Sequence, residues 1–364
     1  MLDASRIPMP SATMQAIVKP EPKPGARLEE VRIPDLGPGD VLVEVRAASI
    51  CGTDLHIYKW DHWSAKRIRP PLVFGHEFCG TVVRVGAEVE IVREGDFVSA
   101  EMHLACGRCF QCRTGQRHIC QNVRIIGVDT DGCFAEFVKI PETNIWKIDP
   151  AIAVEYAAVL DPLGNAVHTV LAGEIAGLSV AVTGCGPIGL FAIAVARASG
   201  AGAIIATEPH PFRQKLAEKV GASMVVDPET TDAVAEVLAA TNGVGADVVL
   251  EMSGNPRAVR QAFQMLRRGG RISLLGIPSK PLELDLANDV IFKGAVVQGI
   301  NGRRVFETWY QMQALLKSGR LDLAPLITDR IGMADFEHGM ELLLSGNASK
   351  VLMFPNGKPP KESG

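Results

Sequence analysis

The chain has 364 residues, more than one hydrophobic core ordinarily organises, so its length suggests two or three domains. Hydrophobic residues make up 47% and charged residues 21%, as in ordinary globular proteins, and the formal net charge of -4 favours neither nucleic acid nor an anionic membrane surface. Residues 1–13 lack the basic start and apolar core of a signal peptide, so we expect no secretion signal.

The first part of the chain predicts a β-rich unit. Residues 14–100 are rich in Val, Gly and Pro, and short alternating runs such as 41–46 and 81–85 are typical of strands. Short strands with frequent turns favour an irregular, barrel-like arrangement. Residues 101–123, dense in cysteine and basic residues, are expected to form a loop.

After about residue 165 the pattern changes to alternating strands and helices. Apolar runs without alternation indicate strands buried on both faces of a parallel sheet, and six of them suffice for a doubly wound α/β domain. The expected strands are 179–183, 203–207, 223–227, 247–251, 271–276 and 296–300. Helices are expected at 187–199, 211–220, 230–240, 256–267, 304–318 and 335–345, followed by a strand at 350–354 and a disordered tail at 358–364.

A glycine motif at the first of these strands predicts a dinucleotide site. Gly184, Gly186 and Gly189 match G-x-G-x-x-G where a strand ends and a helix begins. The helix start offers free N–H groups to a pyrophosphate. Glu208 ends the next strand, where a carboxylate can bind a ribose diol and repel a 2′-phosphate, which favours NAD over NADP. Arg213 lies close enough in sequence to leave the NADP alternative open.

Four cysteines predict a metal site. Cys106, Cys109, Cys112 and Cys120 follow the spacing C-x2-C-x2-C-x7-C. Four thiolates can close a tetrahedron around Zn²⁺ with no open position, which means a structural role. An iron–sulfur cluster has related spacings, but the Pro that trails the last cysteine in such clusters is missing here. A group of this kind belongs in a reducing compartment, so cytoplasm is the expected location.

A second, wider set of ligand types predicts a catalytic metal. Cys51 heads C-G-T-D, His76 and Glu77 lie in G-H-E, and Asp161 begins D-P-L-G-N-A. One thiolate, one imidazole and one or two carboxylates would leave zinc the open position that catalytic sites need. Each of these residues alone is more often a core residue than a ligand.

The order of C-G-T-D, G-H-E, the cysteine loop and the glycine motif resembles the zinc-containing medium-chain alcohol dehydrogenases over residues 15–354. Finer motifs at 54–61, 127–132, 161–167 and 306–310 resemble the threonine dehydrogenases of that family. The resemblance implies a GroES-like catalytic domain at 1–162 and 304–364, a Rossmann domain at 163–303, a homotetramer, and two zinc ions per subunit.

The resemblance also implies roles for single residues. Cys51, His76 and Glu77 match the catalytic zinc ligands, with Asp54 orienting His76, and Asp161 matches either a fourth ligand or a relay group. Thr53 and His56 match a proton relay, and His103 matches a position near the substrate. Contacts to NAD are implied for Ile188, Glu208, Arg213, Leu275, Gly276, Ile277, Ile300 and Asn301.

The resemblance implies the oxidation of L-threonine at C3 to 2-amino-3-oxobutanoate with hydride transfer to NAD. Zinc would act as a Lewis acid on the hydroxyl group, and the proton would leave through Thr53 and the NAD ribose to His56. A polyol or secondary-alcohol dehydrogenase of the sorbitol or butanediol type is the alternative within the same class. A non-catalytic NAD-binding protein is the alternative outside it, but it predicts lost ligands or relay residues, and none is missing.

Overall fold

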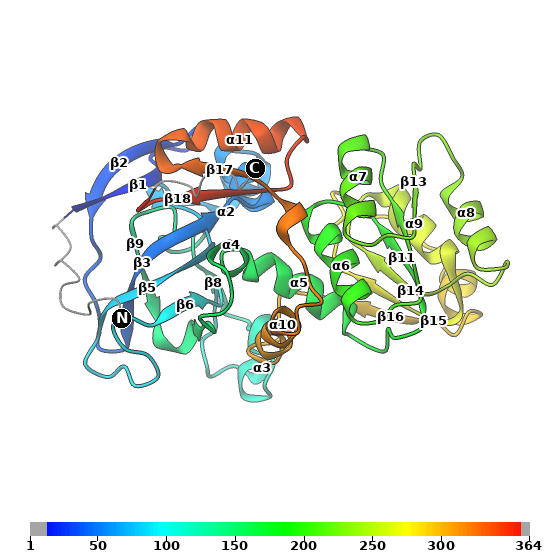
Figure 1. Ribbon diagram of the computed structural model, residues 1–364, viewed down its shortest axis with the longest axis horizontal. Coiled ribbons are helices and arrows are strands. Elements are labelled where there is room, and N and C mark those ends of the chain that lie inside the picture. Colours follow the sequence, from blue (N-terminus) through cyan, green and yellow to red (C-terminus); the bar gives the residue numbers. More distant parts are fainter. Residues whose placement is uncertain (1–12, 358–364) are drawn as a thin grey trace. The chain divides into compact units, whose positions relative to one another are not determined.

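The computed structural model describes residues 13–357 as two compact units (Figure 1). One unit ends at Asp161 and resumes at Asp329, and the other is Pro162–Thr328. Residues 304–328 thus group with the second unit here, whereas the sequence analysis assigns them to the first domain, and that assignment stays a prediction. Two expectations concern residues that the structure does not describe: the absence of a signal peptide, up to residue 12, and the tail at 358–364.

The first unit is built on strands, as expected. One sheet has the order β10-β6-β5-β3-β18-β17 with β9 also on β3, and smaller sheets have the orders β2-β1-β4 and β7-β8. The strands are β1 (Thr13–Lys19), β2 (Arg27–Arg32), β3 (Asp40–Ser49), β4 (Leu72–Val73), β5 (Glu77–Val85), β6 (Phe97–Ala100), β7 (His103–Leu104), β8 (Arg124–Ile125), β9 (Phe137–Pro141), β10 (Ile145–Lys147), β17 (Ile327–Gly332) and β18 (Lys350–Phe354). Its helices are α1 (Gly52–Lys59), α2 (His62–Arg67), α3 (Phe110–Arg113), α4 (Val154–Ala157) and α11 (Phe336–Ser345).

Strand β3 is the centre of this unit. It is buried along most of its length and pairs antiparallel with β5, with Ser49 opposite Glu77. The last strand of the chain, β18, also pairs antiparallel with β3, and Leu352 lies opposite Ser49. Residues from three distant parts of the sequence therefore meet at one end of β3.

The second unit is a doubly wound parallel sheet, which confirms the expected α/β fold class. Its strand order is β13-β12-β11-β14-β15-β16, and every adjacent pair is parallel. The strands are β11 (Ser179–Thr183), β12 (Ala203–Thr207), β13 (Met224–Val226), β14 (Ala246–Glu251), β15 (Leu266–Leu274) and β16 (Val296–Gly299). The helices are α5 (Leu160–Val170), α6 (Pro187–Ala198), α7 (Pro211–Lys219), α8 (Ala233–Ala240), α9 (Pro256–Met265) and α10 (Glu307–Lys317).

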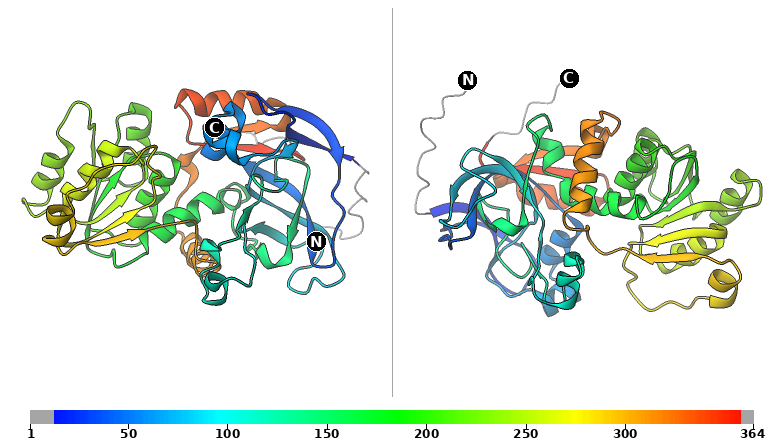
Figure 2. Two further views of the ribbon diagram at one scale, coloured as in Figure 1. Left: turned by 180° about the vertical axis from the view of Figure 1, so that it is seen from behind. Right: turned by 90° about the horizontal axis from the view of Figure 1, so that it is seen from below.

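Right-handed connections place the helices on both faces of this sheet. The chain runs from β11 outward to β13 through α6 and α7, and then returns past β11 to β14 through α8. The views from behind and below follow this path from green to orange (Figure 2). Between β11 and β14 the direction of the connections reverses, and ligands bind at such a switch point, at the carboxyl ends of the strands.

Most expected elements match the observed ones within a few residues, and β15 shows the largest departure. The sequence predicts a strand at 271–276, but the observed strand begins at Leu266, directly after α9. Its pairing with β14 shifts register between Ala246 and Val248. The run Arg-Arg-Gly-Gly lies inside this irregular segment. Because these residues are polar or lack a side chain, the hydrophobicity pattern does not indicate a strand there.

Arg271 on β15 ties α5 to this sheet. Its guanidinium donates to Thr169 O at 3.3 Å, Val170 O at 3.1 Å and Glu174 O at 3.4 Å, and to Ser273 Oγ at 2.6 Å. The last carbonyl groups of a helix have no partner within the helix, so a buried end needs donors from elsewhere. Arg271 supplies them to the C-terminal end of α5.

We expect Arg271→Leu to lower the free energy of unfolding by about 2–3 kcal/mol, because it leaves half-buried carbonyl groups without donors. Urea unfolding measures the loss, and amide hydrogen exchange should rise at the end of α5. Arg260→Leu is the matched control, because Arg260 is exposed and donates only to Glu283 O at 3.3 Å. Equal destabilisation by both substitutions would contradict this role.

Candidate functional site

The end of β3 brings together the three predicted ligands of the catalytic metal. Cys51 follows β3 as the N-cap of α1, and His76 and Glu77 stand where β5 begins. Because Ser49 pairs with Glu77, the antiparallel register sets all three beside one another. One ligand atom from each lies within 4.8 Å of the others, so a single ion can contact all three.

A buried carboxylate supports this cluster. Asp54 is fully buried, and its Oδ2 accepts a hydrogen bond of 2.9 Å from Cys51 N. Its Oδ1 lies 3.7 Å from His76 Nδ1, a distance for an ion pair but too long for a hydrogen bond. Burial raises the pKa of Asp54 to about 6. Burial lowers the pKa of His76, but nearby acids, Asp54 foremost, outweigh it and bring the pKa to about 10.

Lys350 completes the environment of Glu77, and sequence reasoning did not find it. Both side chains are fully buried, and Lys350 Nζ donates to Glu77 Oε2 at 2.5 Å and to Ile50 O at 3.1 Å. Burial raises the pKa of Glu77, but the ammonium of Lys350 outweighs it and holds the pKa below its ordinary value. Glu77 is therefore ionised, and its other oxygen, Oε1, accepts no hydrogen bond among the described residues.

The donor set fits a zinc ion. A thiolate, an imidazole and a carboxylate are three protein ligands of the types that catalytic zinc takes, and three leave one position open. The orphaned Glu77 Oε1 is buried, which is costly unless a cation or a donor satisfies it. The raised pKa of His76 shows that the surrounding acids favour a positive charge at this point.

The other predicted catalytic residues lie around this cluster in different ways. Thr53 Oγ1 is 3.9 Å from Cys51 Sγ, and the buried Asp161, in the first turn of α5, contributes to the raised pKa of His76. His103 on β7 belongs to a separate buried pair, in which its Nδ1 lies 2.6 Å from Glu101 Oε1. Neither His103 nor the more exposed His56 is among the three clustered ligands.

The four cysteines of the loop also cluster as predicted. Their sulfur atoms all lie within 4.8 Å of one another, with Cys109 Sγ at 3.4 Å from Cys112 Sγ and 3.8 Å from Cys120 Sγ. Zinc–sulfur bonds of about 2.3 Å in a tetrahedron require sulfur separations of about 3.8 Å, so the geometry fits zinc. The Asn122 side chain donates to Cys106 Sγ and lowers the pKa of that thiol to about 5, which favours the thiolate that metals bind.

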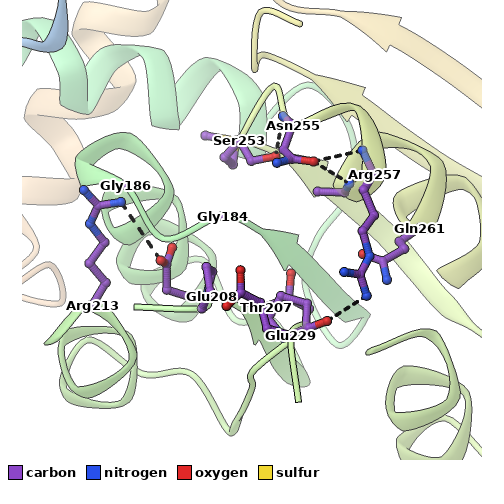
Figure 3. A pocket seen from close by; sticks show the side chains of 14 residues that line it. Gly184, Gly186, Thr207, Glu208, Arg213, Glu229, Ser253, Asn255, Arg257 and Gln261 are labelled. Atoms are coloured by element: carbon purple, nitrogen blue, oxygen red, sulfur yellow. Dashed lines mark hydrogen bonds and ion pairs between the residues drawn. The ribbon is translucent and has the colours of Figure 1, made fainter. Parts of the chain in front are cut away.

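A pocket of about 320 Å³ opens at the switch point of the parallel sheet (Figure 3). It is lined by residues that follow β11, β12 and β14, and four of the predicted NAD contacts are among them: Gly184, Gly186, Glu208 and Arg213. Gly184 has a φ of +88°, and a Cβ there would lie 2.6 Å from Ser253 Cβ. A Cβ at Gly189 would lie 2.1 Å from Gly184 O, whereas Gly186 faces open space, as a phosphate-binding turn requires.

Glu208 is held in a fixed position in this pocket. The side chain is buried, its Oε2 accepts from Cys185 N at 2.7 Å, and its Oε1 accepts from His210 N at 3.0 Å. Arg213 Nη1 lies 4.0 Å from Glu208 Oε1, so the guanidinium is already close to this carboxylate (Figure 3). Because Arg213 lies beside the Glu208 carboxylate, it is less available to bind a 2′-phosphate, and this disfavours the NADP alternative.

The remaining predicted NAD contacts lie outside the lining of this pocket. Ile188 and Gly189 are in the first turns of α6, residues 275–277 follow β15, and residues 300–301 follow β16. Sequence reasoning missed other lining residues: Glu229, Asn255, Arg257 and Gln261. It also missed Glu251, a buried side chain that accepts hydrogen bonds from Ser253 and Gly254 and shapes the loop after β14.

We expect Cys109→Ser to lower the zinc content from two ions per subunit to about one and to destabilise the protein. An incomplete structural site loses binding free energy that contributes to folding. Elemental analysis with a thermal melt measures both effects, and Cys79→Ser is the control, because Cys79 is a buried cysteine that belongs to neither ligand set. A Cys109→Ser protein that keeps its stability and loses only turnover would mean that the roles of the two sites are exchanged.

Two family models match the chain. Residues 37–150 match the alcohol dehydrogenase GroES-like domain, and residues 187–318 match the zinc-binding dehydrogenase model. Among the described residues, no helix is both long and apolar enough to cross a membrane. These matches cover both units.

Curated relatives and solved structures agree with the models. L-threonine 3-dehydrogenase of Bacillus licheniformis is 53% identical, over 85% of this chain and 89% of that protein, and that of Pyrococcus furiosus is 51% identical, over 94% and 99%. The crystal structure of 2R,3R-butanediol dehydrogenase from Bacillus subtilis has a TM-score of 0.85 at 33% identity, covering 94% of this chain and 100% of that one. A zinc-binding dehydrogenase of Sinorhizobium meliloti bound to NADP has a TM-score of 0.87 at 32% identity, covering 95% and 100%. The chain belongs to the zinc-containing medium-chain alcohol dehydrogenases, and within that family it is about 50% identical to several L-threonine 3-dehydrogenases.

Proposed function

We propose that this chain oxidises L-threonine at C3 to 2-amino-3-oxobutanoate and transfers the hydride to NAD. The observation that carries the proposal is the 51% identity, over nearly the full length of both chains, with an L-threonine 3-dehydrogenase. The metal-ligand cluster at Cys51, His76 and Glu77 and the pocket at the switch point supply the two parts that such a reaction needs.

The residues of the chain have distinct tasks in this reaction. Cys51, His76 and Glu77 would hold the zinc, which would supply a Lewis acid for the alcohol oxygen, and bound NAD would supply the hydride acceptor. Thr53, beside Cys51, would accept the hydroxyl proton as it releases its own through the NAD ribose to His56, and His56, with its side chain 58% exposed, would pass a proton to solvent. Asp161 adds negative charge beside His76, as a fourth ligand or as a relay group.

A polyol or butanediol dehydrogenase remains the alternative within this class. Its support is the likeness to the butanediol dehydrogenase structure, at 33% identity against 51% for the threonine enzyme. A non-catalytic NAD-binding protein is disfavoured, because both ligand sets keep the geometry that metal binding requires.

We expect L-threonine to exceed 2-butanol, sorbitol and 2,3-butanediol in kcat/KM, with NADH absorbance as the measurement. A site that binds the charged groups of a substrate rejects analogues without them, because its own polar groups then stay buried and unpaired. We expect His103→Ala to widen the range of amino alcohols accepted. A higher kcat/KM for sorbitol or 2,3-butanediol would overturn the threonine assignment and leave the zinc dehydrogenase assignment standing.

We propose NAD rather than NADP as the preferred dinucleotide, because the carboxylate of Glu208 occupies the end of β12 and Arg213 already lies beside it. Glu208→Ala should reduce the ratio of kcat/KM for NAD over that for NADP by at least about tenfold, since the ribose diol loses its acceptor and a 2′-phosphate loses its repulsion. Glu229→Ala, also in the pocket lining, is the control and should change the ratio little. A wild-type preference for NADP would mean that Arg213 decides the selectivity.

We further propose a cytoplasmic homotetramer with a catalytic domain at 1–162 and 304–364 and an NAD-binding domain at 163–303. The support for assembly is the free edge of the parallel sheet at β16, where Val296 and Val297 are exposed. Ile291 and Phe292, just before that strand, are exposed too. Exposed apolar side chains along a strand edge favour pairing with another chain, and a second copy would cover them.

A further inference from the structure

A sharp turn between α1 and α2 brings a carboxylate to His56. Trp60 ends α1 in the left-handed conformation, with a φ of 57°, and Asp61 then begins α2 as its N-cap. The turn folds the chain back so that Asp61 N donates to His56 O at 3.4 Å. The side chains of residues five positions apart thereby meet.

The two oxygens of Asp61 have separate partners. Oδ1 accepts from Ser64 N at 3.0 Å and caps α2, while Oδ2 lies 2.5 Å from His56 Nδ1. The helix cap fixes the carboxylate, and the carboxylate fixes one edge of the imidazole ring. The ring of Trp63 packs edge-on against the same imidazole, with centroids 6.1 Å apart and planes at 61°.

Charge decides which nitrogen of His56 carries the proton. Burial raises the pKa of Asp61, but the Ser64 N–H and His56 outweigh it and hold the pKa below its ordinary value, so Asp61 is ionised at neutral pH. An ionised carboxylate can only accept hydrogen bonds, so Nδ1 must be the protonated nitrogen of the neutral ring. Nε2 is then left as the basic nitrogen, as the acceptor of a proton relay must be.

We propose that Asp61 is a positioning residue for the proton relay: it holds His56 in the tautomer that accepts a proton at Nε2 and stabilises the imidazolium that forms. The inference rests on the proposed relay role of His56. Asp61 itself touches neither the ligand cluster nor the pocket at the switch point. The proton that reaches Nε2 leaves to solvent, since more than half of the His56 side chain is exposed.

The test uses a variant that retains the helix-capping role of Asp61 Oδ1 and removes the contact of Oδ2 with His56. Asp61→Ser keeps a good N-cap for α2 but removes the acceptor that reaches His56. We expect the first-turnover rate of NADH formation with L-threonine to fall about tenfold, a part of what a general base contributes. The KM values for L-threonine and NAD should change less than about twofold, and so should binding of zinc, because Asp61 is neither in the ligand cluster nor in the pocket lining.

A double-mutant cycle shows whether Asp61 acts through His56. In a His56→Ala background, adding Asp61→Ser should slow the first turnover by less than about twofold, because the group that Asp61 positions is gone. The matched control is Asp232→Ser, which changes an aspartate N-cap of α8 that accepts from Val234 N and Ala235 N. It should lower the melting temperature about as much as Asp61→Ser and leave the rate unchanged.

The outcomes distinguish this inference from the proposed function. An Asp61→Ser rate within about twofold of the wild type, or an equal loss with and without His56, would overturn the role of Asp61 while leaving L-threonine oxidation in place. Full activity of His56→Ala would remove the relay itself and the inference with it. If another secondary alcohol proves the better substrate, the same cycle run on that alcohol decides the role of Asp61.

Discussion

The candidate catalytic centre depends on the pairing of β3 with β5 on one side and β18 on the other. The register with β5 sets His76 and Glu77 beside Cys51, and the register with β18 brings Lys350 to Glu77. A slip of one residue in either pairing would turn the side chains to the opposite face. The buried Lys350–Glu77 pair opposes such a slip, because separating it would leave an uncompensated charge in the core. The same contacts that fix the fold thus fix the ligands.

The two metal sites differ in how they are assembled. Four cysteines within one short loop converge without help from distant strands, and their sulfur separations already suit a tetrahedron. The catalytic set depends on β3 and β5 and is supported by β18, which comes hundreds of residues later in the sequence, and two of its ligands, His76 and Glu77, are buried. A local site can stabilise its own loop, whereas a distributed site needs the folded unit first. This difference matches a structural role for the first and a catalytic role for the second.

Buried or fixed carboxylates support the functional residues throughout the chain. Asp54 stands beside His76, Glu101 binds His103, Asp61 binds His56, and Glu251 organises the loop after β14. Glu101, Asp61 and Glu251 do so through hydrogen bonds, whereas Asp54 lies at the ion-pair distance of 3.7 Å from His76. On α5, two neighbouring residues accommodate the buried Arg303. A Cβ at Gly164 would lie 2.3 Å from Arg303 Cδ, so this position needs a glycine, and Asn165 Oδ1 accepts a hydrogen bond from Arg303 at 3.1 Å. This packing explains why the segment at 161–167 needs a small residue followed by an amide.

Three features follow from residues that are close together in the sequence: the parallel strands, the phosphate-binding turn and the four-cysteine site. The six parallel strands are apolar runs, the phosphate-binding turn needs its glycines, and the cysteine spacing suffices for a tetrahedron. The ligands at Cys51, His76 and Glu77 were proposed from their residue types, and only the family resemblance singled them out, because their spacing alone does not bring them together. The tertiary structure decided the partners: Lys350 on Glu77, Glu101 on His103, and Arg271 at the end of α5. Their physical cause is strand register and helix packing, which join residues that no local pattern connects, so a reading of periodicity and motifs could not find them.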